Sequence, residues 1–173
     1  MGIVWVTGIS GAGKSSVCEA LKGEGHHAID ADWEGYSRWV HRRTGEVVLD
    51  APFPVPAGWL DDHAWRIDVR RVEELAIASA HGATFLCGGA ENEVDVWRHL
   101  RSVVCLVIDD ETLRHRLATR TTNEFGKHPE ELAAALTRNR SQARRYRELG
   151  ASLVDAARPL EEVVHEVLAA AAG

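Results

Sequence analysis

A short glycine-rich segment near the start of the chain carries the residue types that bind nucleotide phosphates. Residues 6–16 read VTGISGAGKSS, and residues 8–15 fit the pattern G-x-x-x-x-G-K-[ST] at every position. Glycines let the backbone curl until successive N–H groups point at phosphate oxygens. The lysine of this pattern reaches the β- and γ-phosphates, and the serine hydroxyl binds the Mg²⁺ that bridges them. The segment therefore predicts a site for a nucleoside triphosphate with Mg²⁺.

The residues around this segment support the same interpretation. The apolar run 3–7 predicts a buried strand before the glycines, and residues 14–25 predict a helix after them. The N-terminus of that helix adds unpaired N–H groups and the positive end of the helix dipole. A glycine-rich turn with a solvated lysine is the alternative. The residues predicted to bind the nucleotide are Gly8, Ser10, Gly11, Ala12, Gly13, Lys14, Ser15 and Ser16, with Lys14 also catalytic and Ser15 a metal ligand.

Two carboxylates follow the next predicted strand. Residues 26–32 read HHAIDAD and end in Asp30 and Asp32. Strand periodicity places both side chains on one face, provided that both residues remain in the strand. A carboxylate at the end of a strand beside the phosphate loop lies near the metal and the transferred phosphoryl group. A helix cap or an exposed turn is the alternative for this pair.

Strand and helix patterns alternate along the whole chain. This order predicts one domain, residues 1–173, with a three-layer α/β/α fold and a five-stranded parallel sheet. Between residues 33 and 60 the periodicity breaks down, and three of the five prolines occur there, which predicts a surface insertion. The strands are predicted at 3–7, 26–32, 83–89, 102–110 and 151–156, and the later helices at 61–82, 93–100, 111–120, 130–150 and 159–172.

Composition narrows the class of protein further. The formal net charge of −6 argues against a general nucleic-acid binder or a membrane-surface protein. No apolar run approaches the roughly 18 residues of a membrane span, and the first predicted strand leaves no room for a signal peptide. Three cysteines without paired spacing do not predict a disulfide framework. We expect a soluble cytoplasmic protein, either a monomer or a homodimer.

These motifs together resemble those of the P-loop kinases of the nucleoside-monophosphate kinase and shikimate/gluconate kinase group. The resemblance covers nearly the whole chain in element order, although only the phosphate loop is a highly specific motif. It implies an ATP- and Mg²⁺-dependent phosphotransferase that acts on a small-molecule acceptor, either a hydroxyl compound or a nucleoside monophosphate. The IDAD segment is similar to the Asp-x-Asp of shikimate kinases, which implies that Asp30 serves the metal and that Asp32 binds the acceptor or acts as the general base.

The same resemblance implies further acceptor-binding residues. Residues 87–93, CGGAENE, resemble the glycine-rich end of the third strand in these kinases, which implies that Gly88 and Gly89 approach the acceptor. Glu91 is a weaker candidate, with a helix-start acid as the alternative. No Walker B acid precedes the glycines, so Asp30 becomes the expected metal carboxylate. Arg66 lies near the position where shikimate kinases place an acceptor-binding arginine.

The arginines of the second half of the chain resemble the lid and adenine-binding residues of these kinases. Residues 116–129 resemble the lid, which implies that Arg120 acts in catalysis and nucleotide binding and that Arg116 supports it. Residues 138–147 contain five arginines, of which Arg140 or Arg144 is expected to reach the phosphates. Residues 155–163 resemble the loop that cradles adenine. The candidates there are Arg158 and Pro159.

The acceptor itself stays open at this level. Four of the six tryptophans lie within or just after the insertion, namely Trp33, Trp39, Trp59 and Trp65. Aromatic faces suit a base or another flat ligand, and they suit equally a small core under a long loop. Two other functions also stay open. One is a nucleotide-dependent switch or accessory ATPase without a small acceptor, and the other is a polynucleotide 5′-hydroxyl kinase, which the acidic charge disfavours.

Overall fold

A five-stranded parallel sheet forms the centre of the molecule. The structure is a computed structural model that describes residues 2–52, 56, 58–121 and 125–173. The sheet has the strand order β2-β5-β1-β6-β7, with β1 in the middle. Every pair of neighbouring strands is parallel. The strands are β1 (Gly2–Gly8), β2 (His27–Asp30), β5 (Ala83–Cys87), β6 (Leu100–Val107) and β7 (Ser152–Asp155).

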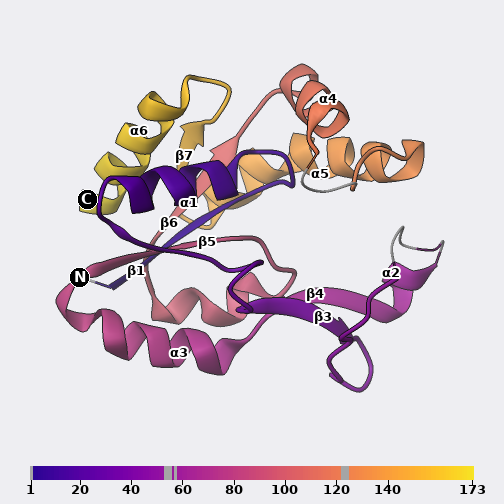
Figure 1. Ribbon diagram of the computed structural model, residues 1–173, viewed down its shortest axis with the longest axis horizontal. Helices are drawn as coiled ribbons and strands as arrows, with labels where there is room; N and C mark the ends of the chain where they lie inside the picture. Colours follow the sequence, from indigo (N-terminus) through magenta and orange to yellow (C-terminus); the bar gives the residue numbers. More distant parts are fainter. Residues whose placement is uncertain (1, 53–55, 57, 122–124) are drawn as a thin grey trace.

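Helices cover both faces of this sheet, as Figure 1 shows. On one face lie α1 (Lys14–Gly23), α4 (Asp110–Thr119) and α6 (Leu160–Ala172), and on the other lie α3 (Val69–Ala78) and the 3₁₀ helices η1 (Ser79–His81) and η2 (Glu93–His99). Helix α5 (Pro129–Glu148) contributes buried residues to the cores on both faces. The three-layer α/β/α fold predicted from the sequence is confirmed.

The apolar run of β1 explains why it occupies the middle strand. Its side chains alternate between two cores, so that Val4 and Val6 pack on the α1 and α6 side while Ile3 and Trp5 pack on the α3 side. All four are fully buried. A strand buried on both faces reads as a continuous apolar run, which is why it could be predicted from the sequence. Because its strands are parallel, the sheet gathers its carboxyl ends at one edge, and the phosphate loop follows β1 there.

The segment between β2 and α3 differs from the prediction. A helix was expected over residues 61–82, but the structure has the short helix α2 (Trp59–Asp62), the strand β4 (His63–Ile67) and then α3. Strand β4 pairs with β3 (Ser37–His41) in a separate antiparallel hairpin. Asp68 caps α3, with its side chain accepting from the Arg71 N–H. The prediction was wrong because β3, the partner strand, lies far away in the sequence.

Figure 1 shows the β3–β4 hairpin and the N-terminal end of α5 at the same end of the sheet. The described parts of segments 33–60 and 116–129 therefore lie at the end where the phosphate loop is found. Residues 53–55, 57 and 122–124 of these two segments lie outside the described residues. Their roles as acceptor-side insertion and lid stay predictions.

Candidate active site

The phosphate loop connects β1 directly to α1. Gly13 precedes the helix with φ of 103°, a left-handed conformation that glycine adopts without strain. Lys14, the first residue of α1, folds back over the loop, and its Nζ donates to the carbonyl oxygens of Gly8 at 2.9 Å and Ile9 at 3.2 Å. Ser15 and Ser16 follow in the first turn with exposed side chains. The predicted nucleotide-binding residues of this loop therefore form one continuous cradle.

Burial and two nearby carboxylates have opposite effects on the pKa of Lys14. Burial lowers the pKa of the Lys14 ammonium, and the nearby carboxylates of Asp32 and Asp30 partly counteract this effect. The Arg120 guanidinium lowers the pKa of Lys14 a little further. The predicted catalytic lysine and both predicted acids are therefore close enough to interact, although they come from different elements.

Asp30 and Asp32 occupy different local structures. Asp30 ends β2 and is buried, and its Oδ1 accepts the backbone N–H groups of Asp32 at 3.1 Å and Trp33 at 3.2 Å. Asp32 falls in the following turn, so the strand periodicity expected to align the two carboxylates does not apply. The Asp32 side chain keeps contact with solvent, and its Oδ1 accepts from Trp65 Nε1 at 3.0 Å. Desolvation by the surrounding protein raises the pKa of Asp32, partly offset by Lys14 and by the Trp65 hydrogen bond.

The glycine pair after β5 is packed into the same region. A Cβ on Gly88 would lie 2.7 Å from the Cβ of Ala31, which is closer than real side chains approach. A Cβ on Gly89 would lie 3.7 Å from the Gly8 carbonyl oxygen and 4.0 Å from Lys14 Cε. The structure therefore brings Gly88 and Gly89 against the turn that carries Asp32 and against the phosphate loop.

Two arginines, Arg116 in α4 and Arg120 directly after it, contact the phosphate loop. Arg116 donates to the Ala12 carbonyl oxygen at 3.1 Å and to the Ala156 carbonyl oxygen at 2.7 Å. Arg120 donates to Ser10 Oγ at 3.1 Å and also bonds the Phe125 carbonyl oxygen. Arg116 thus links the loop to the segment after β7, while Arg120 links it to the connection between α4 and α5. Both predicted arginines reach the site, and their catalytic roles stay predictions.

Arg66 and Glu91 each have a partner away from the phosphate loop. Arg66 lies in β4 and its guanidinium is 3.4 Å from Asp95. Glu91 accepts two hydrogen bonds from Arg42, both at 2.8 Å, in a half-exposed bidentate pair. These contacts hold the hairpin to the segment after the glycine pair. Acceptor binding by Arg66 and Glu91 stays a prediction.

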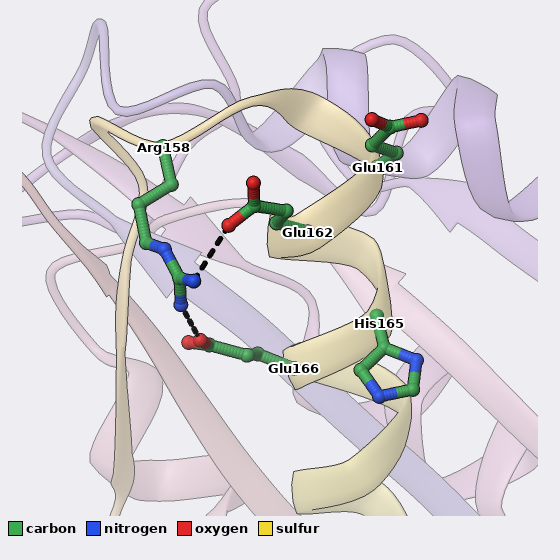
Figure 2. A pocket seen from close by; sticks show the side chains of 5 residues that line it. All are labelled: Arg158, Glu161, Glu162, His165 and Glu166. Carbon is green, nitrogen blue, oxygen red and sulfur yellow. Dashed lines mark hydrogen bonds and ion pairs between the residues drawn. The ribbon is translucent and has the colours of Figure 1, made fainter.

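Each of three further predicted arginines forms an ion pair with a carboxylate. Arg140 is 2.8 Å from Asp110, and Arg144 is 4.0 Å from Glu148. Figure 2 shows Arg158 directed along α6, where it pairs with Glu162 and Glu166.

The surface hollow in Figure 2, of about 310 Å³, is lined by Arg158, His165 and three glutamates, two of which pair with Arg158. Pro159 stands immediately before α6. Adenine binding by Arg158 and Pro159 stays a prediction.

Sequence reasoning missed a buried carboxylate below the site. Glu93 is only 2% exposed, and its carboxylate accepts from Trp5 Nε1 at 3.3 Å, Thr7 Oγ1 at 3.3 Å and the Tyr146 hydroxyl at 2.5 Å. The Arg145 guanidinium is 3.5 Å away. Burial and the Glu93 carboxylate raise the pKa of Tyr146 well above its ordinary value.

Glu93 joins three parts of the molecule that surround the site. Thr7 ends the strand that leads into the phosphate loop, Tyr146 belongs to α5, and Glu93 itself follows the glycine pair. One signal for the burial of Glu93 was present in the sequence. Glu93 lies three residues before the apolar Val96, and residues i and i+3 lie on one side of a 3₁₀ helix, so both could face the core.

The described residues fit a magnesium ion bound together with a nucleotide. Mg²⁺ prefers oxygen ligands and is usually held by one or two protein groups plus phosphates and waters. Ser15 presents an exposed hydroxyl at the start of α1, and Asp30 presents a carboxylate whose Oδ2 makes no hydrogen bond among the described residues. No group of three or more His, Cys, Asp or Glu side chains in the described ranges could hold a metal. The oxygen donors present thus suit Mg²⁺ with phosphate.

A family model described as an AAA domain matches residues 4–147, so the chain belongs to this family. No curated protein matches the chain in sequence. None of the helices within the described ranges is long and apolar enough to cross a membrane.

Solved structures of small kinases share the fold. The gluconokinase from Sinorhizobium meliloti 1021 is 24% identical, with a TM-score of 0.52 over 99% of this chain and 91% of its own. The shikimate kinase from Acinetobacter baumannii in complex with shikimate is 15% identical, with a TM-score of 0.61 over 97% and 91%. The deoxyadenosine kinase from M. mycoides with bound dATP is 12% identical, with a TM-score of 0.51 over 99% and 100%. At these identities, the likeness establishes the fold of this chain.

Proposed function

We propose that the chain is an ATP- and Mg²⁺-dependent phosphotransferase that moves the γ-phosphoryl group of ATP to a small-molecule acceptor. The observation that carries this proposal is that Lys14 and Asp32 both lie beside the Gly88–Gly89 pair, since an added Cβ would lie 3.7 Å from Asp32 Oδ1 at Gly88 and 4.0 Å from Lys14 Cε at Gly89. Lys14 supplies positive charge for the phosphates, and Asp32 supplies a carboxylate for a hydroxyl. The kinases with the same fold make this reaction class the natural one for such a pair.

The chemistry assigned to these residues is an in-line displacement. The acceptor hydroxyl oxygen attacks the γ-phosphorus, and the bond from that phosphorus to the β,γ-bridging oxygen breaks. The electron pair of the broken bond leaves with ADP, and Asp32 takes the proton of the acceptor hydroxyl. Lys14 and Arg120 stabilise the charge that develops on the phosphoryl oxygens. A bound Mg²⁺, held by Ser15 and Asp30, would neutralise phosphate charge.

The test is ADP release from Mg-ATP in the presence of nucleosides, nucleoside monophosphates, shikimate and gluconate. We expect one acceptor to raise ADP release well above the rate without acceptor. Lys14→Ala should lower kcat/KM by about a hundredfold or more, because transition-state charge then lacks its main cation. A rate that no acceptor changes, but that Lys14→Ala abolishes, would replace this proposal with an accessory ATPase. A rate that Lys14→Ala leaves unchanged would exclude both.

A further inference from the structure

The β3–β4 hairpin gathers aromatic rings on one of its faces. Antiparallel pairing places Trp39 opposite Trp65 and His41 opposite His63. Because successive side chains point to opposite faces of a strand, these four rings lie on one face of the hairpin. The Trp39 and Trp65 rings meet edge to face with centroids 5.3 Å apart. The His41 and His63 rings are also 5.3 Å apart.

The opposite face of the hairpin carries arginines that already have acidic partners. Arg38 and Arg66 face each other across the strands. Arg38 lies 3.0 Å from Asp68, and Arg66 lies 3.4 Å from Asp95. These guanidinium groups are therefore placed on the face away from the rings and are engaged with carboxylates. An anionic acceptor on the aromatic face would not meet them.

The aromatic face adjoins the carboxylate assigned to the acceptor. Trp65 Nε1 donates to Asp32 Oδ1, and the Trp65 carbonyl oxygen accepts from the Glu91 N–H at 2.9 Å. One hydrogen bond thus holds the Trp65 indole and another holds its backbone, and the ring lies beside the turn that contains Asp32. A ligand resting on this ring would lie beside the Asp32 carboxylate, which the indole N–H contacts at 3.0 Å. Positioning of the acceptor hydroxyl follows directly from such an arrangement.

Other rings extend the same surface. Trp59 meets Trp39 edge to face at 4.8 Å and stacks on His63 at 4.0 Å. Each of the three tryptophans Trp39, Trp59 and Trp65 keeps part of its surface exposed. Trp33, directly after Asp32, is 76% exposed. Exposed aromatic surface gathered beside the carboxylate proposed to bind the acceptor is a candidate ligand-binding surface.

We propose that the acceptor is an uncharged alcohol that carries a planar ring, a nucleoside being the simplest example. This inference rests on the proposed function and names the acceptor class of the same site. The ring stacks on the aromatic face, and a hydroxyl group lies at Asp32. An acidic acceptor is disfavoured because its carboxylate would lie near Asp30 and Asp32 while the hairpin arginines are paired on the other face.

The first experiment compares neutral and acidic acceptors on the whole chain. ADP release is measured with thymidine, cytidine, adenosine and guanosine, and separately with shikimate and gluconate. We expect a nucleoside to raise ADP release while neither acid does. Stimulation by an acid alone would overturn the inference and leave the proposed function standing. Absence of stimulation by any acceptor would overturn both.

The second experiment tests the ring itself. Trp65→Leu should raise the KM for the stimulating nucleoside about tenfold, the effect of removing one stacking partner from a base. The KM for ATP should stay within about twofold, because Trp65 contacts the Asp32 turn and the Glu91 N–H rather than the phosphate loop. Trp65→Phe keeps a ring and should preserve most of the affinity while lowering kcat, because Asp32 loses its indole N–H donor. This split between KM and kcat separates stacking from a purely structural role.

A third experiment tests the alternative that Arg66, rather than the aromatic face, binds the acceptor. Arg66→Gln removes the arginine that sequence similarity assigns to the acceptor, and Arg98→Gln removes a matched arginine paired with Glu73 elsewhere on the surface. The inference expects both to leave the nucleoside KM within about twofold. A nucleoside KM that rises in Arg66→Gln and not in Trp65→Leu would overturn it. So would a Trp65→Leu protein that only melts earlier, with its nucleoside KM unchanged.

Discussion

At the scale of single residues, Asp32 is the group whose protonation should control the reaction. Burial raises the pKa of its carboxyl, while Lys14 and the Trp65 indole N–H partly offset that rise. Asp32 must be ionised to take the proton of a hydroxyl, so the reaction should slow as the pH falls through the raised pKa. The acid limb of kcat/KM should therefore lie above the ordinary range of an aspartate.

Trp65→Phe should move that acid limb to higher pH, because the variant loses a hydrogen bond that favours the charged carboxylate. Asp32→Asn should remove the limb together with most of the activity. The measurement is the pH profile of kcat/KM for the best acceptor. An acid limb that stays in place in Trp65→Phe would show that another group controls it.

The raised pKa of Asp32 also has a consequence for stability. The folded protein holds this proton more tightly than the unfolded chain does. The contribution of this group to stability is therefore full below the unfolded pKa and is lost as the pH rises through the folded pKa. Asp32→Asn should become more stable relative to the wild type as the pH rises from acid to neutral, as urea midpoints at several pH values would show. A constant difference would contradict this.

Glu93 is the residue whose loss should cost the most stability near the site. Glu93→Ala should lower the free energy of unfolding by about 2–4 kcal/mol, because the donors of Trp5, Thr7 and Tyr146 lose their buried acceptor. Urea unfolding measures this. Glu148→Ala is the matched control, since Glu148 is exposed and paired only at 4.0 Å, and its effect should stay within about 0.5 kcal/mol. Equal losses in the two variants would show that the buried network does not stabilise the fold.

At the scale of elements, the turn after β2 and the end of β5 must touch for the site to form. Gly88→Ala would place a methyl group 2.7 Å from Ala31 and push the Asp32 turn away. We expect about 1–3 kcal/mol of destabilisation and at least a tenfold fall in kcat/KM. Gly82→Ala is the control, because a Cβ there has nothing within 4 Å. A fully active Gly88→Ala protein would show that this close contact is not needed.

The elements also show where sequence reasoning succeeds and where it fails. The strand before the phosphate loop could be predicted because β1 is buried on both faces and reads as an unbroken apolar run. Strand β4 could not, because its partner β3 lies near the start of the 33–60 insertion, far from β4 in the sequence, and the short pattern of β4 also suits a helix. The error moved Trp65 from a strand facing Asp32 to a helix, and so hid the aromatic face.

At the scale of the whole molecule, the sheet brings together residues that are far apart in sequence. Lys14, Asp32, Gly88 and Arg120 all lie near the carboxyl ends of the strands, as open parallel sheets place their ligand sites. The loop between β1 and α1 could be predicted from the sequence because its motif depends on local spacing, and phosphate binding by its residues stays a prediction. The partner of Arg66 could not be predicted, because Asp95 is 29 residues away in the sequence. The pairing of Arg158 with Glu162 is local, at the i,i+4 spacing.

The central claim is that phosphate moves from ATP to an acceptor rather than to water. The most direct measurement follows a label on the γ-phosphate of ATP with the wild-type chain, Mg²⁺ and a stimulating nucleoside, with Lys14→Ala as the blank. The account predicts that the label appears on the nucleoside hydroxyl in step with ADP, and that the blank shows neither. Label found only in free phosphate, whatever acceptor is added, would contradict the account and identify an ATPase.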